Sequence, residues 1–121
     1  MPEAPRERPE NYTLLHSFTG HVKARPRDVF DAIAQRLDPG PGSRSYFTAD
    51  SRAYLVIAQG GWWYRGEYRV VPDDHGSHVE HVILNVAQRG HKLGAWTGRK
   101  AIANAPVEFA RLLRQLRLEL E

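Results

Sequence analysis

Two tyrosines, a histidine and an asparagine are the residues of this sequence whose types and spacing could do chemistry together. Tyr64 and Tyr68 lie in "WWYRGEYRVV", and His81 and Asn85 lie in "HVEHVILNV". Both stretches are rich in β-branched and aromatic residues, which is typical of strands. Residues an even number of positions apart on a strand share one face. Each pair therefore offers hydrogen-bonding groups on one side of its strand, where His81 could move a proton with the tyrosines beside it.

The first turn decides which neighbours Tyr64 meets. Gly60-Gly61 suits a two-residue type I′ turn, which needs two positive φ angles. With this turn, Tyr64 faces Ile57 across the hairpin, and directly paired residues share a face. The uncharged side of the hairpin is taken as the inner face. It is expected to hold Leu55, Ile57, Trp62, Tyr64, Tyr68 and Val70, whereas Tyr54, Val56, Trp63, Arg65, Glu67 and Arg69 point outward.

The second turn, "PDDHGS" at 72–77, decides whether the two polar pairs meet. If Val71 pairs with His78, then Tyr68 faces His81. The inner face gains Val79, His81, Ile83 and Asn85. A slip of one residue would turn all four outward.

An apolar wall with a few convergent polar groups is the usual composition of a small-molecule site. Unpaired polar groups are costly in a dry core, so we expect a ligand, water or mutual hydrogen bonds there. The alternative is that the tyrosines are core aromatics whose hydroxyls reach the rim. The expected lining residues are Leu55, Ile57, Trp62, Tyr64, Tyr68, Val70, His81, Ile83, Asn85, Trp96, Phe109 and Leu113, with His81, Tyr64 and Tyr68 as catalytic candidates.

Two helices and five strands are expected to position these residues. Residues 1–10 are predicted to be a disordered tail, because they are rich in proline and charge, and 11–121 to be a single domain. Strands are predicted at 12–23, 45–49, 53–59, 62–71 and 78–88. Helices are predicted at 25–37 and from Asn104 onward, with Asn104 as N-cap and Pro106 in the first turn. Residues 89–100 are read as a loop or an irregular helical start, with Trp96 as a lid over the cavity or an anchor for the helix that follows.

The order of these elements resembles the START-like superfamily, the helix-grip fold of polyketide cyclases, steroid-transfer domains and a plant pollen allergen. The resemblance rests on "HVKARPRDVFDAIAQ", on "WWYRGEYRVVPDDHGSHVEHVI" and on "PVEFARLLRQLRLELE", and it covers about residues 12–121. It implies an α+β fold in which a curved antiparallel sheet grips the C-terminal helix around a hydrophobic cavity. The family usually has seven strands and two short helices, so this chain would be a trimmed variant. No catalytic motif is shared across the superfamily.

Several classes of function are disfavoured by the composition. The chain has no cysteine, which removes disulfides and thiolate chemistry. No run approaches the length of a membrane span, and the start has no apolar core of the kind found in a secretory signal. We expect a cytoplasmic protein that is a monomer or a homodimer. His75, His78 and His81 alternate faces of a strand and lack an acidic cluster, so we expect no metal and no cofactor.

We expect the protein to bind a small hydrophobic or aromatic molecule, such as a lipid, a polyketide or a related metabolite. The alternative on the same scaffold is a cyclase or dehydratase in which the tyrosines and His81 polarise a carbonyl or move a proton. A third reading is a protein- or nucleic-acid-interaction module that uses the arginine-rich surface. The net charge of +3 is spread along the chain, so nucleic acid is the less favoured partner.

Overall fold

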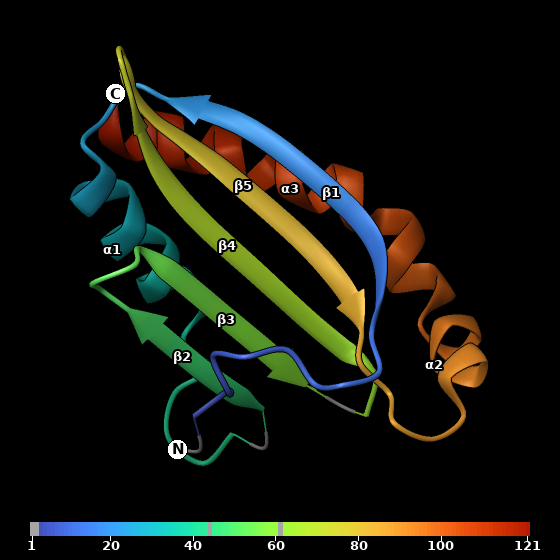
Figure 1. The fold of residues 1–121 in the computed structure, drawn as a ribbon. Helices are drawn as coiled ribbons and strands as arrows, with labels where there is room; N and C mark the ends of the chain where they lie inside the picture. Colours follow the sequence, from blue (N-terminus) through green and yellow to red (C-terminus); the bar gives the residue numbers. More distant parts are fainter. Residues whose placement is uncertain (1–2, 44, 61) are drawn as a thin grey trace.

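The computed structural model describes residues 3–43, 45–60 and 62–121. Their order is β1 (Thr13–Val22), α1 (Pro26–Leu37), β2 (Tyr46–Asp50), β3 (Leu55–Gly60), β4 (Tyr64–Asp73), β5 (Gly76–Asn85), α2 (His91–Thr97) and α3 (Arg99–Leu120). The strands form one antiparallel sheet in the order β1-β5-β4-β3-β2 (Figure 1). The α+β class, the five strands and the C-terminal helix are confirmed.

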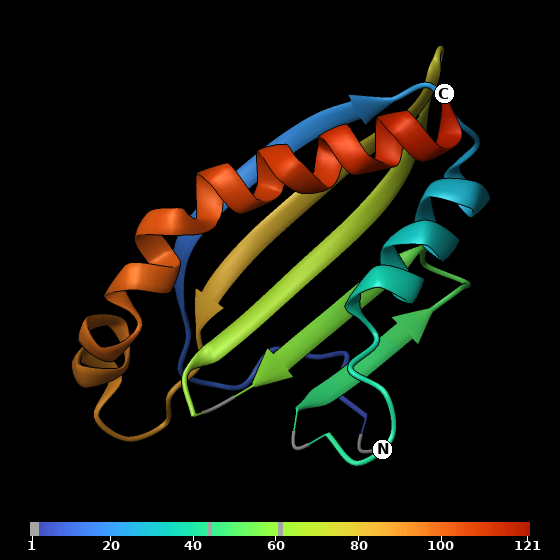
Figure 2. The same ribbon diagram turned by 180° about the vertical axis from the view of Figure 1, so that it is seen from behind.

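α1 and α3 lie on one face of the sheet, here called the inner face, as Figure 2 shows. α3 runs along β1 and β5, and α1 packs near β3 and β4. The core lies between these layers, where α1 contributes Val29 and Ile33 and α3 contributes Phe109 and Leu116. α3 sits close to β1, because a Cβ added at Gly20 would overlap the side chain of Leu113. No helix in the part of the chain that the structure describes is long and apolar enough to span a membrane.

The hairpin between β4 and β5 has the expected register. Val71 pairs with His78, Tyr68 with His81, and Tyr64 with Asn85. The register is therefore predicted correctly, and the inner face contains the polar pairs as expected. The turn itself is shorter than the predicted 72–77, because Asp73 pairs with Gly76 and only Asp74 and His75 connect the strands.

The hairpin between β3 and β4 differs from the prediction. Gly60 belongs to β3 and pairs with Tyr64, so residues 61–63 form the connection, of which Gly61 lies outside the described residues. Ile57 pairs with Glu67 rather than Tyr64. The shift is three residues, and an odd shift exchanges the two faces of a strand. Leu55 and Ile57 therefore lie on the outer face, whereas Val56 lies in the core with Tyr68.

An N-terminal segment covers part of this outer face. The sequence predicts a disordered tail at 1–10, whereas the structure places Ala4 in a buried cluster with Leu55 and Ile57. The carbonyl of Ala4 accepts a hydrogen bond from the Thr48 hydroxyl at 2.6 Å. Beside it, the fully buried Arg65 donates to the carbonyl of Pro5 at 2.7 Å. The segment has no regular secondary structure and is held by its backbone carbonyls and by the side chains of Arg6 and Arg8, which bond Asp50 and Glu67.

α3 begins at Arg99, so the prediction of a start at Asn104 is wrong and Pro106 lies inside the helix. Proline has no N–H, so the carbonyl four residues earlier loses its partner in the helix. That carbonyl belongs to Ile102, and it accepts a hydrogen bond from His16 Nε2 of β1 at 2.8 Å. A side chain of the sheet thus replaces the donor that Pro106 lacks.

Candidate functional site

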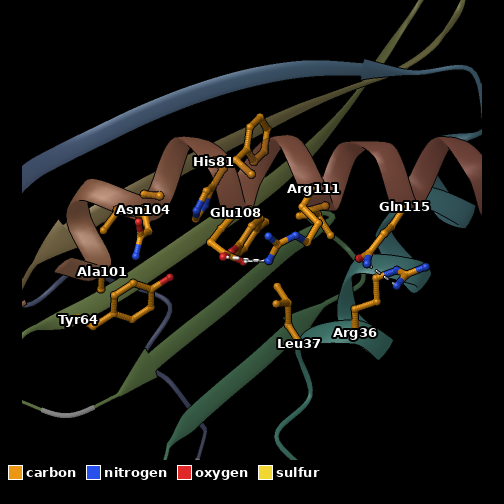
Figure 3. Close-up of a pocket in the computed structure, with 14 residues that line it drawn as sticks. Arg36, Leu37, Tyr64, His81, Ala101, Asn104, Glu108, Arg111 and Gln115 are labelled. Atoms are coloured by element: carbon orange, nitrogen blue, oxygen red, sulfur yellow. Dashed lines mark hydrogen bonds and ion pairs between the residues drawn. The ribbon is translucent and has the colours of Figure 1, made fainter.

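A pocket of about 500 Å³ lies between α3, the end of α1 and the inner face of β4 and β5. Figure 3 shows its lining side chains. Its floor is formed by the sheet, one wall by α3 and a short side by the last turn of α1. The lining residues are Arg36, Leu37, Tyr64, Tyr68, His81, Ile83, Ala101, Asn104, Ala105, Glu108, Phe109, Arg111, Leu112 and Gln115.

Tyr68 and His81 form the centre of the floor. They face each other across β4 and β5, and their rings stack with centroids 3.8 Å apart and planes 6° apart. Phe109 of α3 and Phe18 of β1 also stack with the imidazole, with centroids 5.6 Å and 5.9 Å away. The His81 ring is thus fixed by aromatic neighbours from three elements, and only 4% of the residue is exposed.

His81 is held as a neutral imidazole. Its Nδ1 lies 3.0 Å from the backbone carbonyl of Glu67, and a carbonyl only accepts, so Nδ1 carries the proton. Nε2 is then the unprotonated nitrogen and can accept a hydrogen bond. Burial lowers the pKa of His81 to about 4, and the nearby His16 adds a smaller decrease. The hydrogen bond to the Glu67 carbonyl acts in the opposite direction but is outweighed. The site therefore presents an acceptor at neutral pH.

Tyr64 and Tyr68 supply donors beside that acceptor. Burial raises the pKa of both phenols, and that of Tyr68 is raised further by the neighbouring Tyr64. Both hydroxyls therefore keep their protons at neutral pH. Gly66 lies between them on the same face, and a Cβ there would be 2.5 Å from the Tyr64 hydroxyl oxygen. The absence of a side chain at Gly66 leaves room for Tyr64 to lie along β4 toward Tyr68.

Charged side chains form the rim of the pocket on the helix side. Arg111 donates to Glu108 one turn earlier on α3, at 3.1 Å. Arg36, from α1, donates to Glu119 at 2.6 Å and to the Gln115 side chain at 3.4 Å. Figure 3 shows the Arg111–Glu108 and Arg36–Gln115 pairs along one edge of the pocket, with Tyr64 near the other end. The pocket therefore combines an aromatic floor with a polar rim.

Five of the twelve predicted lining residues line the pocket: Tyr64, Tyr68, His81, Ile83 and Phe109. Val70 and Leu113 lie on the expected face but are buried in the core beside it. Leu55 and Ile57 lie on the opposite face for the reason given above.

Asn85 lies on the inner face but works as a structural clamp. Its amide nitrogen donates to the His91 carbonyl at 2.6 Å, and its side-chain oxygen accepts from the Ala87 backbone at 3.1 Å. These bonds fix the chain as it leaves β5 and enters α2. Asn85 is therefore absent from the pocket lining.

The tryptophans are arranged differently from the expectation. Trp96 is 62% exposed on α2 and Trp62 is 46% exposed in the turn before β4, so neither closes the pocket. Trp63 instead packs against the helices, because a Cβ added at Gly94 or Gly98 would overlap its side chain. Trp63 also meets Tyr64 edge to face at 5.5 Å. Trp63 therefore contacts a lining residue directly.

Sequence reasoning missed the residues of α1 and α3 at the rim. The lining residues of α3 include Ala101, Asn104, Ala105, Glu108, Arg111, Leu112 and Gln115. They recur at spacings of three and four, so they form a stripe beside the buried one. The signal was present in the sequence, but polar residues at helical spacing usually indicate a solvated face. The stripe is recognised as a pocket wall only when the structure shows that α1 and α3 lie on the same face of the sheet with the pocket between them.

No group of three metal-ligating side chains occurs among the residues described by the structure. The histidines have separate contacts: His91, for example, bonds the Thr13 hydroxyl at 2.6 Å and the Ala87 carbonyl at 2.8 Å.

Comparisons with known proteins found no matching family model, no matching curated protein and no matching solved structure.

Proposed function

We propose that this protein binds a small hydrophobic or aromatic molecule in the pocket between the sheet and α3. The observation that carries the proposal is the stacked pair Tyr68 and His81 on the floor of a pocket of about 500 Å³. Pockets of this size suit small molecules, and a lining rich in aromatic and apolar side chains favours apolar or aromatic ligands. Lipids, polyketides and related metabolites are the classes that we propose.

The polar groups define what the ligand needs. His81 Nε2 accepts, and the Tyr64 and Tyr68 hydroxyls donate, so a ligand hydroxyl or carbonyl at this end would be satisfied. At the rim, Arg111 and Arg36 are paired with Glu108 and Glu119, so this end is polar without a net positive charge and would favour a ligand with a polar end. A molecule with an apolar body and one oxygen-bearing group at each end fits this arrangement best.

We further propose that the architecture is a shortened helix-grip fold of the START-like type. The position of the C-terminal helix along the inner face, with a pocket beneath it, supports this assignment. The five strands and the short α2 would then be the trimmed form of the larger fold.

The binding proposal is tested with a fluorescent probe that has an apolar aromatic body and an anionic group, 1-anilinonaphthalene-8-sulfonate, and by native mass spectrometry of the purified protein. We expect probe binding with a change in tryptophan emission, because Trp63 contacts Tyr64. Tyr64→Ala should weaken probe binding at least several-fold. The matched control is Tyr46→Ala, which removes an exposed tyrosine of β2 that lies outside the pocket lining. Equal probe affinity in both variants would refute the proposal.

A second candidate is a cyclase- or dehydratase-type enzyme in the same pocket. The observation in its favour is the unprotonated Nε2 of His81 beside two neutral phenols. The pKa of about 4 argues against it, because a general base is most effective when its pKa lies near the working pH. Binding is therefore the preferred function.

His81→Gln separates the two functions. A binding protein should change affinity modestly, with nearly flat pH dependence between pH 5 and 8. An enzyme should lose turnover by about a hundredfold or more, while Arg114→Gln on the exposed side of α3 keeps it. Turnover of a polyketide-like substrate with that pattern would overturn the preference for binding.

A further inference from the structure

α2 lies at one end of the molecule (Figure 1) and carries exposed apolar side chains. Leu93 and Trp96 lie one turn apart on this helix and are 59% and 62% exposed. Trp62, from the turn before β4, is 46% exposed and lies near Leu93, because a Cβ added at Gly90 would contact both Leu93 and Trp62 at 3.7 Å. These three side chains are called the α2 edge below. Solvated apolar side chains gathered at one place indicate an interaction surface.

The opposite side of α2 explains why this edge is turned outward. Gly94 and Gly98 pack directly on Trp63, so the glycine side of the helix is its buried side. Leu93 precedes Gly94 by one residue and Trp96 follows it by two. At about 100° of rotation per residue, both side chains point away from the buried glycine side. The exposure of Leu93 and Trp96 is therefore built into the packing of the helix.

Basic residues surround the α2 edge. Arg89, Lys92, Arg99 and Lys100 are all exposed, and none forms an ion pair with another described residue. Between Glu80 and Glu108 the chain contains no acidic residue. Glu10 precedes Asn11, which contacts Gln88 near the end of β5, so one negative charge approaches this end. The local balance stays positive.

We propose that the α2 edge docks on an anionic lipid bilayer. Tryptophan and leucine on one edge of a short helix, flanked by lysine and arginine, are the composition of interfacial membrane-binding segments. The guanidinium of Arg99 lies 4.1 Å from the centre of the Trp96 ring, so cation and indole occupy the same depth, as they do at a headgroup layer. The anionic headgroups of the bilayer would supply the negative partners that the four cations lack among the described residues. This inference does not depend on what the pocket holds.

The test measures co-sedimentation of the whole protein with vesicles. Vesicles of phosphatidylcholine with about 30% phosphatidylserine are compared with phosphatidylcholine alone. We expect binding to the anionic vesicles only, weakening with salt. Lys92→Ala should reduce partitioning about fivefold, and the double variant Lys92→Ala/Lys100→Ala about 25-fold, since each cation contributes similarly. Trp96→Ala should also reduce it, because its indole enters the interface.

The controls are Leu118→Ala and Arg114→Ala, which remove an exposed apolar residue and an exposed cation elsewhere on α3. They should bind as the unchanged protein does, and circular dichroism checks that every variant is folded. Equal binding to both kinds of vesicle, or equal loss in the controls, would overturn the proposal. Two other results would also overturn it. One is a dimer that forms without lipid and that Trp96→Ala dissociates. The other is an RNA oligonucleotide that displaces the vesicles and binds the Trp96→Ala variant equally well.

Discussion

His81 is the buried titratable residue on which the pocket depends. Its imidazole is stacked with Tyr68 and Phe109 and is hydrogen-bonded to the Glu67 carbonyl. Protonation in this environment is costly, because the charge would be placed in an apolar surrounding beside the ring of His16. The same environment that makes Nε2 an acceptor therefore makes the folded state sensitive to acid.

The free energy of unfolding should fall as the pH drops from about 6.5 to about 4. In this window the unfolded chain binds a proton at His81 and the folded chain does not, so acid favours unfolding. The full loss is about 3 kcal/mol. Urea unfolding at several pH values measures it.

His81→Gln should flatten the stability profile in that window, whereas His78→Gln, the neighbouring histidine on β5, should keep it. An identical slope in His81→Gln and the unchanged protein would contradict this assignment.

His16 and Pro106 are coupled through the Ile102 carbonyl. His16→Ala should destabilise the protein by about 1–2 kcal/mol, because a half-buried carbonyl loses its donor. Pro106→Ala restores a backbone N–H at the position that normally bonds this carbonyl. In the Pro106→Ala background, His16→Ala should therefore cost much less.

Urea unfolding of the two single variants and the double variant gives the coupling energy. Additive effects of the two changes would show that the bond from His16 does not compensate for Pro106.

At the scale of elements, the N-terminal segment completes the outer face of the sheet. Arg65 donates to the carbonyls of Pro5 and Arg6, and to Glu67 at 2.9 Å. Burial raises the pKa of Glu67, but hydrogen bonds from Arg8 and Arg65 outweigh it, and the pKa stays below its usual value. A buried guanidinium requires such a complete set of partners. The segment therefore serves as the cover that allows a charged residue to lie in the sheet.

Deletion of the first eight residues should lower the free energy of unfolding by about 2 kcal/mol. The deletion removes two acceptors of Arg65 and the acceptor of Thr48, each worth about 1 kcal/mol net, and exposes Leu55 and Ile57. Part of this is offset by water reaching Arg65. Urea unfolding at neutral pH is the measurement.

Arg6→Ala in the full chain is the control, since the pair that Arg6 forms with Asp50 is exposed and contributes at most about 1 kcal/mol. An unchanged urea midpoint after the deletion would show that the segment contributes nothing to stability.

For the whole molecule, local patterns predicted the elements well and the contacts between distant elements poorly. The alternation in β4 and β5 placed Tyr68 opposite His81 correctly, because both strands carry strong period-two patterns. The Gly60-Gly61 signal failed because Trp63 is needed in the turn, where it packs against Gly94 and Gly98. Those glycines lie in residues 89–100, for which the sequence predicts a loop or an irregular helical start and where the structure has α2 and the start of α3. The hydrogen bond that the Pro5 carbonyl accepts could not be predicted, because every residue has a backbone carbonyl and the sequence does not indicate which one is used.

Sheet order and chain order differ at β1, and this has a consequence for how the protein is made. β1 leaves the ribosome first, but its partner β5 is the last strand: Thr13 pairs with Asn85 and Val22 with Ser77. The hairpins among β2, β3, β4 and β5 close short loops. Pairing β1 with β5 closes a much longer loop, which costs more conformational entropy. We expect β1 to join last during refolding. Pulsed hydrogen exchange should show amides of β4 protected before those of β1, and until then β5 is an open sheet edge available to a second nascent chain.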